Sequence, residues 1–187
     1  AYPPAPDPAS LDNNEPLPTT DPPAPAKDET AESATAVFDK AREAFKKGDY
    51  EGAQKLTEDA IVKLPSDATL HEFRALCLFA QGKYSSAAGT QYAVLAAGPG
   101  WNWDTMQALY GDPNTYRRQL RSLEEFVTKN PDDGAAHFVL AYQYLVLGNK
   151  DEAIKQLEAT VKAQPEDKLS AELLKALKAD PQQPPPG

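Results

Sequence analysis

The feature that most constrains the fold is a set of four prolines at nearly regular intervals. Pro65, Pro99, Pro131 and Pro165 are separated by 34, 32 and 34 residues. Self-similarity at one such period is typical of repeat proteins, in which each repeat is a small structural unit that stacks on the next. The chain is therefore expected to form a stack of similar units.

A shared pattern of glycine and alanine precedes three of these prolines. In each case a glycine stands five residues before an alanine, and the pairs are Gly48 and Ala53, Gly82 and Ala87, and Gly148 and Ala153. The glycine is expected to turn the chain between two helices, and the alanine to let those helices cross closely. Apolar-periodic segments before the glycines, at 38–46, 70–80 and 135–146, supply the first helix of each pair.

This pattern resembles the tetratricopeptide repeat, a 34-residue pair of antiparallel helices. The resemblance rests on small residues at Ala41, Ala75 and Ala141, on Gly-x-Tyr at 48–50 and 82–84, and on the late prolines. Lys150 stands where the usual tyrosine would be, and Val37, His71 and His137 are weak choices for the large residue at position 4. The resemblance implies an all-α, right-handed superhelical solenoid of four helix hairpins plus a C-terminal capping helix.

The repeat phase divides the chain into a domain over 31–180 and two tails. The expected repeats are about 34–67, 68–99, 100–133 and 134–167, followed by a capping helix over 168–179 that covers the apolar face of the last repeat. Residues 1–30 are proline-rich and acidic, and 181–187 are proline-rich, so both are expected to be disordered spacers.

The third repeat is expected to be irregular. It contains both tryptophans, and the phase places Trp103 in the core and Trp101 in the concave groove, unless Trp101 packs back on the preceding helix. Gly111 stops a helix, whereas Asp112 followed by Pro113 starts one, so the first helix should be short and the second long. Because Gln119 takes the place of the small alanine, we expect this repeat to open or kink the superhelix.

Nothing in the sequence supports catalysis, a metal site or a cofactor. His71 and His137 occupy equivalent positions two repeats apart, with no ligand cluster around either, so both are expected to be packing residues. The single Cys77 lies in an apolar stretch and reads as a core thiol. "GPG" at 98–100 is not followed by the residues of a phosphate-binding loop.

The resemblance places eight residues in the concave groove of the solenoid, which is expected to be aromatic and apolar with few charges: Phe38, Arg42, Phe45, Glu72, Phe79, Trp101, Phe138 and Tyr142. Family members that grip a C-terminal carboxylate use lysine, asparagine and arginine at fixed positions. Those positions hold Phe38, Arg42, Phe73, Asp104 and Ala108 here, so that carboxylate clamp is absent.

We therefore expect a non-enzymatic interaction module that binds an apolar peptide segment of a protein partner in this groove. The alternative is a structural protein whose groove is filled by its own tail or by a second copy, with self-association. A net charge of −9 and the absence of a basic cluster exclude nucleic acid as a partner, and no apolar run is long enough for membrane insertion. The acidic arm and the start at Ala1 favour an exported, envelope-associated protein, with the cytoplasm as the alternative.

Overall fold

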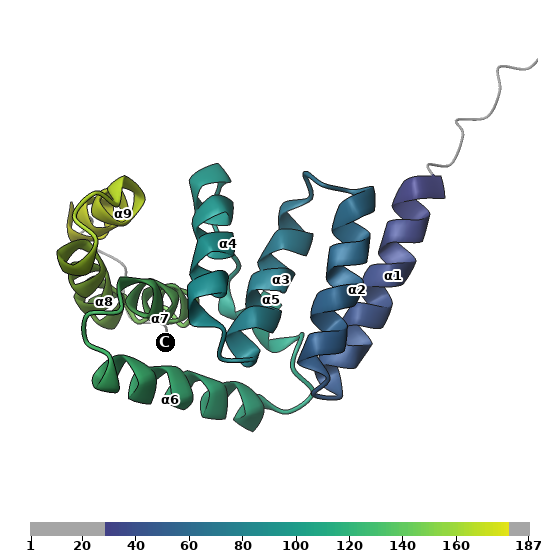
Figure 1. The fold of residues 1–187 in the computed structure, drawn as a ribbon, viewed down its shortest axis with the longest axis horizontal. Coiled ribbons are helices and arrows are strands. Elements are labelled where there is room, and N and C mark those ends of the chain that lie inside the picture. The colour runs from purple at the N-terminus through teal and green to yellow at the C-terminus, as the bar shows by residue number, and fades with distance from the viewer. Residues whose placement is uncertain (1–28, 180–187) are drawn as a thin grey trace, which may run out of the picture.

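The computed structural model describes residues 29–179, and every regular element in that range is a helix (Figure 1). The nine helices of this part of the chain are α1 (Glu29–Lys46), α2 (Tyr50–Lys63), α3 (Ala68–Ala80), α4 (Tyr84–Ala97), α5 (Trp103–Gln107), α6 (Pro113–Lys129), α7 (Gly134–Val146), α8 (Lys150–Ala163) and α9 (Lys168–Ala179). Glu29 and Thr30, expected in a tail, belong to α1; the rest of both predicted tails lies outside the described residues.

Glycines and aspartates set the ends of the helices. Gly48, Gly82 and Gly148 have φ values of 84°, 72° and 74°, a left-handed conformation that glycine adopts without strain, and each turns the chain between paired helices. At the start of α6, the Asp112 side chain accepts a hydrogen bond from the Asn114 N–H, and proline follows at the first helical position. The hairpin turns and the start of α6 are thus confirmed as the sequence predicts them.

Small residues let the paired helices approach each other. Ala53, Ala87 and Ala153 are fully buried, as are Ala41 and Ala75 on the partner helices. Pairing joins α1 to α2, α3 to α4 and α7 to α8, and successive pairs stack on one another. The predicted all-α helical-repeat solenoid is confirmed.

The third repeat departs from the expected stack. In chain order α5 would pack on α4, but α4 packs on α7 instead, so the stack runs α1, α2, α3, α4, α7, α8, α9. In Figure 1, α6 crosses one end of the upright helices and returns the chain to α7. The physical reason is length and polarity: α5 has only five residues, whereas α7 has 13 with no charged side chain and can bury most of its surface.

The solenoid ends on α9, which packs on α8 as the expected capping helix. Leu169, Leu173 and Leu177 contact the core, and Lys178 pairs with Glu158 of α8 at 2.6 Å. Across residues 29–179, no helix combines the length and the apolarity that crossing a bilayer requires.

Candidate interaction site

Residues 98–116, here called the central segment, pack on the faces of the first helices where the groove was expected. The ring of Tyr110 lies 5.0 Å from that of Phe45 on α1, centroid to centroid, and the ring of Tyr116 lies 6.3 Å from that of Phe79 on α3. The Tyr116 hydroxyl donates a hydrogen bond to Gln143 Oε1 on α7 at 3.2 Å. The central segment therefore joins repeats that are far apart in the sequence.

Glu72 on α3 holds the beginning of the central segment. Its Oε1 accepts a hydrogen bond from the backbone N–H of Trp101 at 2.6 Å and a second from the hydroxyl of Tyr142 on α7. The side chain is 5% exposed, and burial raises the pKa of Glu72 although both hydrogen bonds oppose the shift. At the neighbouring Gly100, a Cβ would lie 2.8 Å from the Tyr142 ring, so only glycine allows the chain to pass this closely.

The expected open groove is therefore not the arrangement that these residues adopt. Of the eight predicted groove residues, five are at most 5% exposed: Phe45, Glu72, Phe79, Phe138 and Tyr142. Phe38, Arg42 and Trp101 are partly exposed. The occupant of most of this surface is an internal segment of the chain, because the third repeat has left the stack and packs against it. A role of these residues in binding remains a prediction.

Both tryptophans lie in the central segment and pack against the core. The ring of Trp103 packs 5.0 Å from that of Tyr116 but stays partly exposed, so it is less buried than a core position predicts. Trp101 is also partly buried and contacts the core, which agrees with packing back on the preceding helices. The aromatic concentration at this joint thus stabilises the displaced third repeat.

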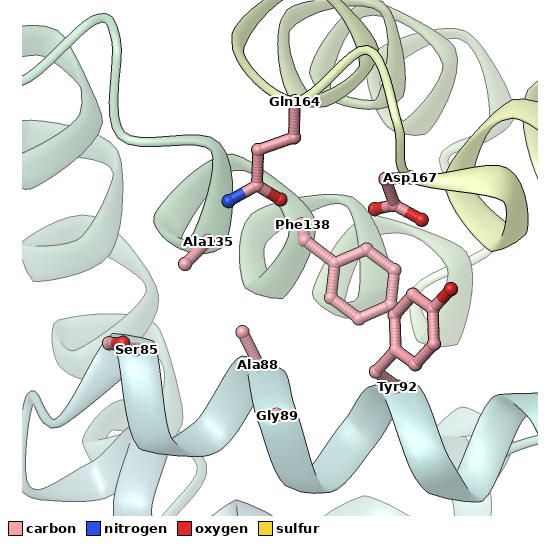
Figure 2. Close-up of a pocket in the computed structure, with 8 residues that line it drawn as sticks. All are labelled: Ser85, Ala88, Gly89, Tyr92, Ala135, Phe138, Gln164 and Asp167. Atoms are coloured by element: carbon pink, nitrogen blue, oxygen red, sulfur yellow. The ribbon is translucent and has the colours of Figure 1, made fainter.

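An open pocket remains between α4 and α7, at the contact that α5 would make in a regular stack. Its volume is about 410 Å³, within the range of ligand pockets. Figure 2 shows the rings of Tyr92 and Phe138 side by side, with Ala88 opposite Ala135 and the Gln164 side chain reaching over the opening. The lining residues are Ser85, Ala88, Gly89, Tyr92, Ala135, Phe138, Gln164 and Asp167. One predicted groove residue, Phe138, is thus among them.

The wall that α4 contributes is unlike the same face of the other second helices. Two positions of that face carry Lys55 and Glu58 on α2, and Lys155 and Glu158 on α8. On α4 they carry Gly89 and Tyr92. Glu58 and Glu158 make salt bridges to the next helix, whereas Tyr92 contacts the Phe138 ring at 6.0 Å and is 38% exposed. A charged face has been replaced by an apolar one that is open to solvent.

A smaller pocket of about 140 Å³ beside α1 repeats part of this geometry. It contains Phe38, Leu64 and Asp67, which occupy the same repeat positions as Phe138, Gln164 and Asp167. Both pockets therefore lie where the first helix of a repeat meets the loop that ends the same repeat. The pocket at α1 is smaller because it has no equivalent of the α4 wall.

Gly89 and Tyr92 are not among the predicted site residues, because the predicted groove residues come from the first helices and the start of the third repeat, whereas these two lie on a second helix. A signal was available: α4 has no charged residue in 14, whereas α2 and α8 carry several charges each. A second helix without charged residues lacks the polar face of an ordinary surface helix, which indicates that its outer face also contacts protein.

Titratable groups do not assemble into a chemical site in the described range. Among residues 29–179, no group of three or more His, Cys, Asp or Glu side chains is placed to hold a metal ion. His71 Nε2 lies 2.7 Å from the Pro65 carbonyl oxygen and His137 Nε2 lies 3.0 Å from that of Pro131, so each histidine fastens the loop before its helix. Cys77 is fully buried, and burial raises the pKa of its thiol.

Comparison with known proteins agrees with this geometry. Two models of the tetratricopeptide repeat match the chain, at residues 38–100 and 120–180. The interval between them falls on the displaced third repeat. Among curated proteins, no sequence matches the chain.

Among the solved structures similar to this chain are two of the first TPR domain of RPAP3. The first TPR of Spaghetti (RPAP3), bound to the HSP90 peptide SRMEEVD, is 16% identical, with 80% of this chain and 93% of that chain covered and a TM-score of 0.36. The NMR structure of the first TPR domain of the human RPAP3 protein is also 16% identical, with 80% and 92% covered and a TM-score of 0.38. These superpositions are loose, and nothing about binding follows from them.

The stacked hairpins, the glycine turns and the buried crossing alanines define a helical-repeat solenoid of the kind used for protein interaction. The chain belongs to the tetratricopeptide repeat family. Domains of this family are generally non-catalytic modules that bind protein partners.

Proposed function

We propose that this protein binds a partner protein by taking an apolar side chain of the partner into the pocket between α4 and α7. The observation that carries the proposal is the replacement of a lysine and a glutamate by Gly89 and Tyr92 on the face of α4 that lines the pocket. The substitution of two charged residues makes this face of α4 apolar while Tyr92 stays 38% exposed, and exposed apolar faces mark interaction sites.

The pocket suits one anchoring side chain in an otherwise extended peptide. Phe138 and Tyr92 offer aromatic surface, and Ala88 and Ala135 leave the space between the helices open (Figure 2). The Gln164 amide at the rim can bond the backbone of a bound peptide, whereas the Asp167 carboxylate accepts from the Ser170 N–H and hydroxyl. Buried aromatic or aliphatic anchors of this kind carry most of the binding energy in peptide interfaces.

The test fills the pocket without disturbing the fold. A Cβ at Gly89 meets no atom within 4 Å, so Gly89→Leu places a side chain in the pocket. Helical glycine is less favourable than other residues by about 1 kcal/mol, so this variant is expected to melt at or above the wild-type temperature. Lys55→Leu, at the same repeat position on α2, is the matched control.

Peptides would be selected from a displayed random library against the full chain, and their affinities measured by fluorescence anisotropy. We expect selected peptides to share a large apolar residue, to lose at least about tenfold in affinity for Gly89→Leu, and to bind Lys55→Leu like wild type. Failure to select any peptide, or equal binding to Gly89→Leu and wild type, would contradict the proposal.

The alternative of an assembly protein is tested separately by sedimentation. The central segment already fills much of the inner face, so a second copy would have to use another surface. Self-association of the full chain that persists on dilution would support that alternative.

A further inference from the structure

Three arginines, Arg117, Arg118 and Arg121, form a cluster on the exposed face of α6, so the expectation that the chain has no basic cluster is wrong at this helix. The opposite face of the helix buries Tyr116, Leu123 and Val127 against the stack. Arg121 is four residues from Arg117 and three from Arg118, so it is a neighbour of both on the helix surface. Like charges at these spacings destabilise a helix, and no acidic residue stands in the first turn of α6 to offset them.

Asp112, Glu124 and Glu125 stand near this arginine cluster in the sequence, but only Asp112 is within ion-pair distance of one of the arginines. Arg118 lies 3.8 Å from Asp112 Oδ2, a long contact between two exposed side chains and therefore a weak one. Within residues 29–179, neither Arg117 nor Arg121 has an acidic partner within 4.0 Å. This exposed basic surface can attract a segment of opposite charge.

The chain itself contains a segment of complementary charge. Residues 1–28 contain five acidic residues and one lysine, and two of the acids, Asp12 and Glu15, stand three residues apart. Because this segment is tethered to α1, its local concentration at the domain surface is of the order of millimolar, so weak charge contacts suffice to hold it.

The lengths also agree. The 18 residues of α1 span about 27 Å. The far end of α1 contacts the loop before α6, since a Cβ at Gly111 would lie 3.2 Å from the Lys46 carbonyl oxygen. The arginine cluster is about 6 to 12 Å further along α6. In an extended chain at ~3.1 Å per residue, Asp12 and Glu15 reach about 53 and about 43 Å from Glu29, which is enough to pass α1 and meet the arginine cluster, whereas Asp21 reaches only about 25 Å.

We propose that residues 12–15 of this chain dock on Arg117, Arg118 and Arg121 of α6 within the same molecule. The contact is electrostatic, between carboxylates of the N-terminal segment and guanidinium groups, and it covers α6 rather than the pocket between α4 and α7. A partner with a more acidic segment would compete for α6 and release the N-terminal segment.

The full chain with Ser10→Cys allows a direct test, because buried Cys77 does not react and a nitroxide spin label attaches at residue 10 alone. Amide signals of 117–121 should then lose intensity in an NMR spectrum relative to those of α8. The loss should disappear in Arg117→Gln with Arg121→Gln, and in ~0.5 M NaCl, where screening shortens the range of charge interactions to a few ångströms.

The matched control, Lys155→Gln with Lys162→Gln on α8, should leave the broadening unchanged. Tenfold dilution should also leave it unchanged, because the contact is intramolecular. The proposal is overturned if no broadening occurs, if it appears on another helix, or if it survives the arginine substitutions. Broadening that decreases on dilution would assign the contact to a second copy and would equally overturn it.

Discussion

Glu72 is the residue on which the displaced repeat depends most directly. Its carboxylate joins α3 to α7 through Tyr142 and to the central segment through the backbone of Trp101. No Lys or Arg in residues 29–179 forms a salt bridge with it, so the charge is stabilised by hydrogen bonds alone. A buried carboxylate without a cation costs stability when ionised, which makes this contact sensitive to pH.

We predict that Glu72 makes the protein less stable as pH rises. Because burial raises the pKa of Glu72 in the folded state, the folded state binds its proton more tightly than the unfolded state. The contribution of Glu72 to the free energy of unfolding is therefore present at low pH. It is lost as pH rises above the ordinary carboxyl pKa and through the raised pKa of the folded state. In urea unfolding between pH 4 and pH 8, the free energy of unfolding of wild type should fall relative to that of Glu72→Gln.

All other carboxyl groups are common to wild type and Glu72→Gln, so the difference between their stability curves isolates this residue. Parallel curves over the whole range would show that ionisation of Glu72 does not oppose folding. A difference of the opposite sign would mean that the hydrogen bonds from Trp101 and Tyr142 outweigh the cost of burial.

At the scale of elements, the close crossing of paired helices depends on single alanines. Ala53 and Ala87 are fully buried and have no solvent-accessible surface. In the third repeat the equivalent position is Gln119, whose Oε1 accepts a hydrogen bond from the Tyr110 hydroxyl at 2.7 Å. A polar side chain fits there because α5 and α6 do not pair as the other helices do.

We predict that Ala53→Leu and Ala87→Leu each lower the free energy of unfolding by roughly 1 to 3 kcal/mol, because the crossing leaves no room for three added carbons. Ala96→Leu, on the exposed side of α4, should change it by less than about 0.5 kcal/mol. Thermal or urea denaturation measures all three. Equal effects at Ala87 and Ala96 would show that helix propensity, not the crossing, decides the cost.

At the scale of the whole molecule, the central segment changes how the repeats cooperate. In a linear solenoid each repeat contacts only its neighbours, so ends can unfold separately. Here Tyr110 packs on Phe45 of the first repeat while Tyr116 bonds Gln143 of the last. These long-range contacts are expected to make the described domain unfold as one unit.

We predict coincident urea unfolding curves from helical circular dichroism and from tryptophan fluorescence, since both tryptophans lie in the central segment. Tyr110→Ala removes the contact with Phe45 and should separate the two curves, with the fluorescence change at lower urea. Tyr92→Ala, which changes an exposed aromatic outside the central segment, should keep them together. Separate transitions already in wild type would contradict this account of cooperativity.

Local features of the chain predicted the elements and most of their ends. Left-handed turns at Gly48, Gly82 and Gly148, the start of α6 at Asp112 and Pro113, and the buried alanines all follow from residues within one or two turns. The repeat period therefore determined the three regular hairpins and the capping helix by itself. The short α5 and long α6 also followed from a local break at residues 111–113.

Only the tertiary structure decided where the irregular repeat goes and, with it, where a site remains open. The same apolar residues can face a groove or a neighbouring segment, and periodicity does not distinguish these environments because burial depends on residues distant in the sequence. Once α5 is too short to stack, α7 buries its surface on α4 and the central segment covers Phe45, Glu72 and Phe79. That rearrangement fills much of the predicted groove and leaves the pocket beside Tyr92, because the lowest free energy belongs to the arrangement that removes most apolar surface from water.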